Sequence, residues 1–509
     1  CTGRGGCLLL GVWPVRTVFL RVGHERGTEA GLREAIKAPQ AGGRQGRFDV
    51  DPQSFSSVPR SPFAYWVSDA TRKLFTDLPP FEGDGRAAKQ GLATSDDWRF
   101  LRLWWEPRAR PHRRWFCFAK GGRYSPHYLP IPLVLDWLDE GRELKAFAET
   151  TPGTTHWSRR VPNSEFYFQP GLTWPVRAVG LSPSPVPRNS IFSARGYLAL
   201  APEAQLLSLM ALMSSRPFEG LFRLELAGVR PEFVVGVLTH VPVPLGLDDE
   251  GGPLGQLARS AWSLKRGLDT RSENTHAFSL PALLQSPGDT LATRAAAWAD
   301  RVDTTGSELA AIQAEIDDRC FGLYGIDDED RKAITEGFGG TIAAPPIDDA
   351  AGEAASDSSS ASEAAAQTRA AADDFEPDDS DESTSADATV LTAELLSWSI
   401  GVASGRFDLR LATGERALPP EPDPFDPLPV SSPGMLTGAD GLPCVTPPPG
   451  YPIDIPQDGV LLDDPGHPRD LLAAARAVFD VVFAATADAD ERWQEAAGIL
   501  DPKNHDLRA

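Results

Sequence analysis

The first half of the chain alternates apolar and polar residues in short runs that predict strands and one buried helix. The helix is predicted for EAQLLSLMALMSS (203–215), in which large apolar residues dominate. The predicted strands are VRTVFLRV (15–22), LVLDWL (133–138), RLELAGV (223–229) and EFVVGVLTHVPV (232–243). A short helix is also predicted for GTEAGLREAIK (27–37). This mixture predicts an α+β fold, with a mixed α/β domain over residues 59–246.

From about residue 253 the apolar residues recur at three- and four-residue spacing, which predicts helices. The two helical segments are residues 256–273 and 290–326. The apolar stripe of the second segment is Leu291, Ala295, Trp298, Val302, Leu309, Ile312 and Ile316. We expect a pair of long antiparallel helices that acts as a spacer over residues 253–335. An ordinary helical bundle without a binding role is the alternative.

The composition changes again near residue 340. Residues 340–389 are mainly Ala, Ser, Asp and Glu, so they cannot bury enough apolar surface to offset the entropy of ordering. We therefore predict a disordered acidic linker, followed by a C-terminal extension over residues 390–509. Within this extension, residues 418–472 hold many prolines, which predicts an irregular strap laid on the surface. A last helix is predicted over residues 468–485.

Charge is distributed unevenly along the chain. The net charge is −22, but residues 348–387 alone hold thirteen acidic residues against one base, Arg369. Residues 60–240, in contrast, hold twenty-three Lys or Arg and seventeen acidic residues. A neutral-to-basic folded part joined to an acidic linker differs from a uniformly acidic protein, and it leaves room for a polyanionic partner.

Residues 99–124 combine eight Lys or Arg with one acidic residue, Glu106, and seven aromatic rings. Cations near phosphates release counterions, Arg can pair with guanine edges, and rings stack on exposed bases. Around Lys120, Gly121 and Gly122 the backbone could approach a phosphate, because glycine has no Cβ. The stretch is therefore a candidate DNA-contacting surface. In the alternative interpretation its rings lie in the core and its arginines simply face water.

A second basic patch comprises Arg159, Arg160 and FYFQPGLTWPVR (166–177). Trp174 in this patch either faces a groove or wedges between strands. We expect the cations of both patches to line one continuous positive trough wide enough for a duplex. The residues predicted to contact DNA are Arg99, Arg102, Arg113, Arg114, Lys120, Gly121, Gly122, Arg123, Tyr124, Arg159, Arg160, Trp174 and Arg177.

Sequence signals for other chemistry are weak. The eight histidines show no metal-ligand spacing, neither GxSxG nor a P-loop occurs, and we expect no bound metal. Asp136, Asp139 and Glu143-Leu144-Lys145 loosely match the acid-x-Lys pattern of metal-dependent nucleases, but DWLDEGRELKAF is more typical of a turn and a helix. The five cysteines form no CxxC pair, which fits a reducing cytoplasm. No apolar run approaches the roughly 18 residues of a membrane span.

Several segments carry a family resemblance in the same order. They are SPFAYWVSD (61–69), QGLATSDDWRFLRLWWE (90–106), RWFCFAKGGRYSPHY (114–128), NSEFYFQPGLTWP (163–175) and EFVVGVLTHVPVP (232–244). Together they resemble the region that follows the catalytic domain in large adenine-specific DNA methyltransferases. These enzymes are the type IIG restriction–modification enzymes and the PglX methyltransferases of BREX phage-defence systems. The proline-rich strap resembles the C-terminal part of such proteins.

The resemblance implies an enzyme that uses S-adenosyl-L-methionine and holds a flipped adenine with an Asn-Pro-Pro-aromatic motif. TDLPPFEG (76–83) has Leu78 where this motif needs Asn, and it lies downstream of the first family segment. The resemblance also implies that residues 1–58 are the end of a methyltransferase domain and that double-stranded DNA is the partner. We therefore predict a target-recognition part without its catalytic half. A split methyltransferase, whose catalytic half binds in trans, and a non-catalytic scaffold are the alternatives.

Overall fold

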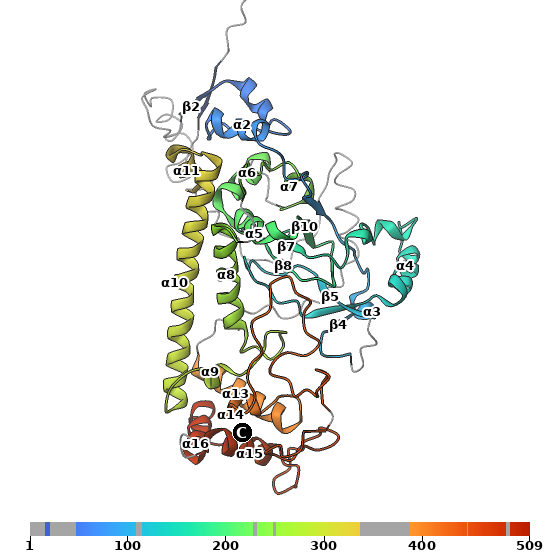
Figure 1. Ribbon diagram of the computed structural model, residues 1–509, viewed down its shortest axis with the longest axis vertical. Helices are drawn as coiled ribbons and strands as arrows, with labels where there is room; N and C mark the ends of the chain where they lie inside the picture. Colours follow the sequence, from blue (N-terminus) through green and yellow to red (C-terminus); the bar gives the residue numbers. More distant parts are fainter. Residues whose placement is uncertain are drawn as a thin grey trace, which may run out of the picture.

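The computed structural model describes residues 16–20, 47–107, 114–226, 232–247, 251–335, 387–444, 446–484 and 489–508. The molecule is elongated, with helix α10 (Leu291–Tyr324) along one side and the small sheets on the other (Figure 1). The helix predicted over residues 27–37 and nearly all of the predicted linker lie outside the described residues.

Two four-stranded sheets form the centre of the mixed α/β part, in the orders β3–β10–β7–β8 and β4–β6–β5–β9. The strands of the first sheet are β3 (Ala87–Lys89), β7 (Gly171–Pro175), β8 (Ser184–Val186) and β10 (Gly196–Leu200). The strands of the second sheet are β4 (Leu101–Leu103), β5 (Trp115–Ala119), β6 (Leu133–Asp136) and β9 (Ser190–Phe192). The chain passes from the second sheet to the first between β9 and β10, so the two sheets are directly joined.

Side-chain alternation decides which face of the second sheet becomes core. Leu101 lies opposite Leu135 in the β4–β6 ladder, and both are buried. Because successive residues of a strand point to opposite faces, Arg102 of β4 and Trp115 of β5 project from the other face. The predicted strand in residues 133–138 is confirmed as β6, and its register places a basic, aromatic row on the outer face.

The predicted buried helix is confirmed, but two predicted strands are wrong. Helix α5 (Leu206–Ser214) follows the short η5 (Glu203–Gln205). Residues 223–226 belong to helix α6 (Arg216–Leu226), whose apolar residues recur at helical spacing once Phe218 and Leu221 are included. Residues 232–243 form the short helix α7 (Val235–Leu238) within irregular chain. Short apolar runs fit either element, and here burial against the first sheet selects the helix.

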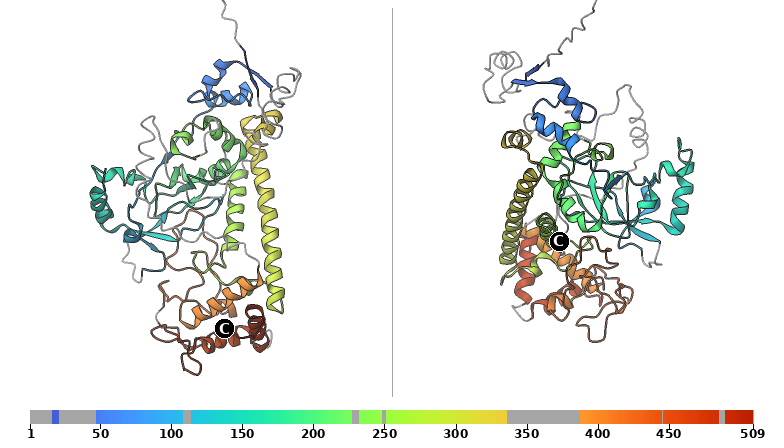
Figure 2. Two further views of the ribbon diagram at one scale, coloured as in Figure 1. Left: turned by 180° about the vertical axis from the view of Figure 1, so that it is seen from behind. Right: turned by 45° about the horizontal axis from the view of Figure 1, so that its top comes forward.

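The predicted long helical pair is confirmed. Helix α8 (Pro253–Asp269) packs against α10, and Arg301 Nη2 donates to the Gly267 carbonyl at 3.1 Å. Figures 1 and 2 show the two helices running antiparallel. Helix α10 contributes to two cores: Ile316 and Cys320 join the core of the first sheet, whereas Leu291 and Trp298 join a separate C-terminal core. The helix thus connects the two cores.

The C-terminal core is built mainly from helices. They are α9 (Ala282–Gln285), α13 (Ala388–Ala403), α14 (Arg410–Thr413), α15 (Leu471–Phe483) and α16 (Ala489–Leu500). Helix α15 confirms the helix predicted over residues 468–485. The predicted linker runs to residue 389, but Asp387 already caps α13, so the boundary lies three residues earlier. Between α14 and α15 the described residues form no helix or strand, but Phe425 and Leu436 are buried, so the strap is not purely superficial.

A small ribbon and helix precede the sheets. Strand β1 (Thr17–Leu20) confirms the strand predicted over residues 15–22 and pairs antiparallel with β2 (Arg47–Val50). The short η2 (Pro52–Ser57) and helix α2 (Asp69–Asp77) follow. Asp330 of α11 (Asp328–Thr335) accepts the Ser68 backbone N–H at 2.9 and 3.0 Å and thereby anchors the start of α2. None of the helices in the described ranges is long and apolar enough to cross a membrane.

Candidate nucleic-acid interface

Helix α3 (Asp97–Phe100) presents an exposed tryptophan beside two arginines. Asp96 caps this helix, because its Oδ1 accepts the Arg99 backbone N–H at 3.0 Å. Two residues apart on a helix point in nearly opposite directions, so Phe100 enters the core while Trp98 remains 64% exposed. The chain turns directly into β4, where Arg102 Nη1 donates to the Trp98 carbonyl at 2.8 Å.

Trp115 of β5 forms a platform for two guanidinium groups on the outer face of the second sheet. Arg102 lies 5.9 Å and Arg114 5.4 Å from the centroid of its ring, within cation–π range. Arg114 also donates to Asp136 Oδ2 from Nε at 3.1 Å and from Nη2 at 2.8 Å. This hydrogen bond raises the pKa of Arg114, so the group stays cationic, and its side chain remains 43% exposed.

The third cation of this face, Arg99, is held by helix α4 (Leu138–Thr150). Arg99 Nη2 donates to Glu143 Oε1 at 2.7 Å, and its guanidinium lies 4.9 Å from the Phe147 ring centroid. The helix interpretation of DWLDEGRELKAF is confirmed. Asp136 and Glu143 are each paired with an arginine, and the described residues contain no group of three potential metal ligands.

Arg159 is the last residue of the short η3 (Trp157–Arg159), and Arg160 follows as its C-cap. This element packs beside α4. Arg159 is exposed and donates to the Gly153 carbonyl at 3.3 Å, and Arg160 Nε donates to Thr154 Oγ1 at 3.4 Å. Lys145 of α4 lies 4.7 Å from the centroid of Trp157. The ribbon places α3, β4 and α4 on one side of the molecule (Figure 1).

Lys120, Gly121 and Gly122 serve the fold in this conformation. Lys120 Nζ donates to Asp97 Oδ2 at 2.7 Å, and both side chains are largely buried. Gly121 has φ +96°, and a Cβ on it would lie 2.9 Å from the Arg195 carbonyl oxygen. The glycine backbone that was predicted to approach a phosphate is therefore packed closely against the chain that leads into β10. A Cβ on Gly122 would lie 3.1 Å from a methyl carbon of Leu129.

Arg123 and Tyr124 face other elements. Burial raises the pKa of Asp269 in α8, and the positive charge of Arg123 opposes part of this rise. Tyr124 is 47% exposed, and burial together with Glu219 of α6 raises the pKa of its phenol. Arg123 is therefore near α8 and Tyr124 near α6.

The remaining predicted contacts are also dispersed. Trp174 is fully buried in β7 and its Nε1 donates to the Phe233 carbonyl at 2.7 Å, so the wedge interpretation is confirmed and the groove interpretation is wrong. Arg177 is exposed and paired with Glu232 at 3.0 Å. Arg113 lies outside the described residues. The predicted set is thus divided among several surroundings. Arg102 and Arg114 gather around the half-buried Trp115, and Arg99 joins them through Glu143, whose charge also acts on Arg114.

Two residues of this gathering, Trp98 and Trp115, were missed as contacts by the sequence analysis. A capping Asp96 followed by Trp-Arg-Phe could have signalled Trp98, because Phe100 and Trp98 cannot both face the core from so short a helix. We define the Trp98 face as Trp98, Arg99, Arg102, Arg114 and Trp115. Its chemistry, partly exposed guanidinium groups around indole rings, suits a polyanion that also presents flat apolar groups.

Sequence comparison with known proteins finds similarity to one enzyme class. No family model matches the chain. "Adenine-specific methyltransferase PglX" from Lacticaseibacillus casei (strain Zhang) is 23% identical over 295 residues, covering 54% of this chain and 24% of that protein. "Adenine-specific methyltransferase BrxX" from Escherichia coli O9:H4 (strain HS) is 24% identical over 274 residues, covering 52% of this chain and 21% of that protein. The chain therefore spans less than a quarter of the length of these relatives, and the resemblance to adenine-specific methyltransferases is supported over about half of this chain.

Proposed function

We propose that this chain recognises double-stranded DNA as the target-recognition part of a site-specific adenine-N6 methyltransferase that acts in phage defence or restriction–modification in the cytoplasm. The observation that carries the proposal is the Trp98 face. Trp98 is 64% exposed and adjoins Arg99 in α3, its carbonyl accepts from Arg102, and Arg102 and Arg114 both lie over the Trp115 ring. The similarity to PglX and BrxX supports the enzyme class. Methyl transfer itself is assigned to a catalytic part outside this chain, within a longer polypeptide or in trans.

The residues that the structure describes do not fit the cofactor that the methyltransferase resemblance implies. A class I S-adenosylmethionine site needs a glycine-rich loop between a strand and a helix. In the described ranges, β6 leads into α4 with one glycine, Gly141, whose left-handed φ of +72° belongs to a turn packed on Trp137. We therefore assign no step of the methyl transfer to these side chains.

The Arg99–Glu143 pair of the Trp98 face suits exchange with a phosphate. Both of its side chains are exposed, and such surface pairs contribute only about 0–1 kcal/mol. A phosphate can replace Glu143 on Arg99 at little cost, with release of counterions from the DNA, whereas Arg114 keeps the largely buried Asp136 and would meet a phosphate through its 43% exposed side chain. The indole of Trp98 would then pack on a sugar or on a base exposed when the duplex opens.

The salt dependence of duplex binding tests the proposal. Phosphate contacts by the three arginines of the Trp98 face predict a slope of roughly −3 in a plot of log K against log salt. Replacing Arg102 and Arg114 together with Gln should reduce this slope by roughly 2. Arg177→Gln is the matched control, because Arg177 is exposed but lies on another part of the surface, and it should leave the slope unchanged. Absence of binding at about 50 mM salt, or a flat slope, would overturn the proposal and favour the scaffold alternative.

A reconstitution assay tests the assignment to a methyltransferase. The chain is mixed with a separately produced catalytic part of an adenine-specific methyltransferase, and transfer of a labelled methyl group to DNA is measured. We expect methylation at a defined sequence that neither component gives alone. Methylation that is identical with and without this chain would remove its role in target recognition.

A further inference from the structure

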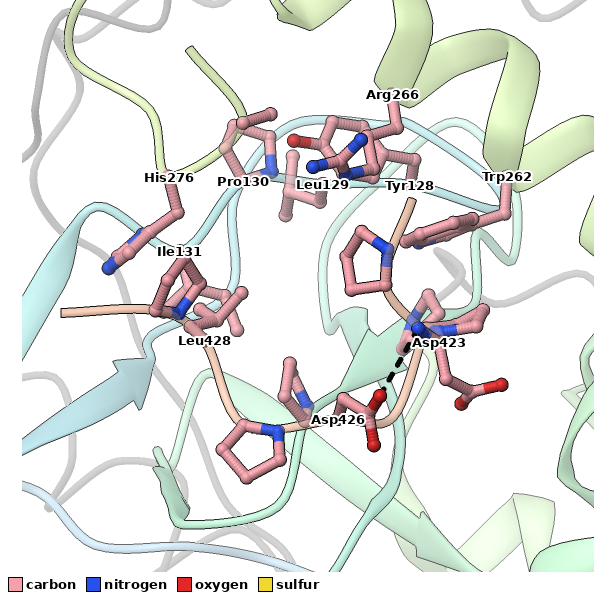
Figure 3. Close-up of a pocket in the computed structure, with 17 residues that line it drawn as sticks. Tyr128, Leu129, Pro130, Ile131, Trp262, Arg266, His276, Asp423, Asp426 and Leu428 are labelled. Carbon is pink, nitrogen blue, oxygen red and sulfur yellow. Dashed lines mark hydrogen bonds between the residues drawn. The ribbon is translucent and has the colours of Figure 1, made fainter. Parts of the chain in front are cut away.

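A short acidic segment of the proline-rich strap, residues 421–429, packs against the mixed α/β part and helix α8. This segment, EPDPFDPLP, contains four prolines and three carboxylates. On one side it faces α8. On the other side it faces residues 128–131 and the chain at the end of β8, which includes Pro187 (Figure 3). The segment is far in sequence from all of these elements, so it occupies a site that the rest of the chain forms.

The acidic side chains of the segment are matched by cations on the groove. Helix α8 places Arg259, Ser263 and Arg266 on one face at helical spacing. Arg259 pairs with Asp423, and Ser263 Oγ donates to the two carboxylate oxygens of Glu421 at 3.0 and 2.9 Å. Arg266 approaches the same carboxylate at 3.8 Å. Charge complementarity therefore specifies an acidic occupant.

A second set of contacts fixes the register of the segment. The Arg188 backbone N–H donates to the Phe425 carbonyl at 3.0 Å, and the Arg188 guanidinium lies 3.6 Å from the Asp426 carboxylate. The Phe425 side chain is 3% exposed and inserts into the core of the first sheet. One buried aromatic anchor, one backbone hydrogen bond and a row of ion pairs are the contacts by which folded domains hold short peptides.

The walls of the groove favour prolines. Trp262 and Tyr128 meet edge to face with centroids 6.4 Å apart, and both line the pocket together with Pro185 and Pro187. Figure 3 shows the segment curving around an open space that Trp262, Tyr128 and His276 border. Aromatic grooves bind proline-rich segments well because prolines lose little conformational entropy on binding. The space left between segment and walls also distinguishes this contact from a fully packed core.

We propose that this groove is a recognition site for acidic proline-rich peptides, which residues 421–429 occupy in cis and which the same segment of a second copy can occupy in trans. The site joins the recognition part to the C-terminal helices, because the strap leads from α14 to α15. Exchange of the segment between copies would link two chains without any new interface.

A labelled peptide of residues 418–430 tests the proposal by fluorescence anisotropy against three full-length proteins. They are the unaltered chain, Phe425→Ala, and a chain in which residues 421–429 are replaced by Gly and Ser at equal length. We expect the peptide to bind the replaced chain at least about tenfold tighter than the unaltered chain, with Phe425→Ala between them. Arg259→Ala in the replaced chain should weaken the peptide several-fold, and more at low salt than at high salt.

Two control peptides decide the outcome, one with the Phe replaced by Ala and one with the sequence scrambled. Equal binding of either control would overturn the proposal, as would equal peptide affinity for Phe425→Ala and the unaltered chain. Circular dichroism establishes whether the replaced chain folds. Where it does not, Phe425→Ala decides alone, because this variant keeps every charge of the segment.

Discussion

Trp98 has an exposure that the fold does not require. It is the largest side chain on α3, yet 64% of it is exposed, while Phe100 in the same helix is almost fully buried. Exposed apolar surface next to cations is typical of a binding site. We predict that Trp98→Ala lowers the affinity for DNA about tenfold, because stacking on one base contributes roughly 1–3 kcal/mol. Titration of labelled duplex, monitored by anisotropy, measures the effect.

Leu245→Ala provides the control for this substitution. Leu245 is 71% exposed and lies beyond α7, so its removal changes exposed apolar area without touching the Trp98 face. Both variants should change the free energy of unfolding by less than about 0.5 kcal/mol, as expected for surface positions. Equal DNA affinities for Trp98→Ala and Leu245→Ala would remove Trp98 from the interface.

His127 makes the stability of the protein depend on pH. Burial, together with the charge of Lys265, lowers the pKa of His127 to about 4, from an ordinary value of 6.5. Between these values the unfolded chain binds a proton that the folded chain does not, so stability is lost as the pH falls below 6.5. This histidine alone should reduce the free energy of unfolding by roughly 2 kcal/mol between pH 7 and pH 5.

Comparison with His127→Asn isolates this contribution. His127 has a φ of +74°, and among non-titrating residues that carry a side chain Asn tolerates this left-handed region best. The variant should be less stable at pH 7, but its stability should fall less steeply toward pH 5. Urea unfolding at several pH values gives both curves. Parallel curves for the two proteins would contradict a neutral, buried His127.

At the scale of elements, the sequence predicted those helices whose apolar pattern is long or unmixed. Helices α8 and α10 were predicted because many residues agree on one period, and α5 was predicted because large apolar residues dominate it. Residues 223–226 were predicted as strand because RLEL alternates. The helical pattern appears only with Phe218 and Leu221, which precede this run. Short apolar runs do not contain enough residues to distinguish the two periods.

The candidate site could be predicted only in part, for a physical reason. That residues 99–124 carry cations among rings is visible in the sequence. That Lys120 forms a largely buried ion pair with Asp97 is not, because the partner lies 23 residues away and is brought close by the β5 strand. Trp174 likewise reads as a possible contact until Phe233, from a distant segment, covers it. Tertiary partners decide which cations and rings stay at the surface.

Helix α10 allows a test of how elements are coupled. Gly306 lies near its middle, exposed, between the residues that join the two cores, and a Cβ there meets nothing within 4 Å. Gly306→Ala should raise the free energy of unfolding by roughly 0.5–1 kcal/mol, because Ala loses less backbone entropy in a helix. Gly306→Pro should lower it by about 3 kcal/mol or more and interrupt the helix.

The proline variant should also separate the unfolding of the two cores. Guanidinium unfolding of the unaltered chain and of Gly306→Ala should give coincident curves by circular dichroism and by tryptophan fluorescence. Gly306→Pro should make the two curves diverge, since the continuous helix then no longer couples the cores. Coincident curves for Gly306→Pro would show that other contacts, such as the strap, carry the coupling.

At the scale of the whole molecule, the net charge opposes the proposed partner. The chain carries −22, and residues 348–387 contribute more than half of it. The net negative charge therefore opposes the approach of a polyanion to the chain, and salt screens this repulsion over roughly one Debye length, about 10 Å at 0.1 M salt. Local cations can still bind phosphates, because contacts at short range are screened less than the field of distant charges.

Neutralising these residues should therefore speed DNA association. We predict that replacing the acidic residues of 348–382 with Ser and Gln, and keeping the α13 cap Asp387, raises the association rate several-fold at about 30 mM salt and leaves it unchanged at about 0.5 M, where the field is screened. Stopped-flow fluorescence with labelled duplex measures the rate. A variant with the same residues in shuffled order keeps the charge and should behave like the unaltered chain. If the shuffled variant associates faster than the unaltered chain, the effect belongs to the order of residues and not to their charge. If the neutral variant associates at the same rate as the unaltered chain, the net charge does not affect DNA binding at the Trp98 face.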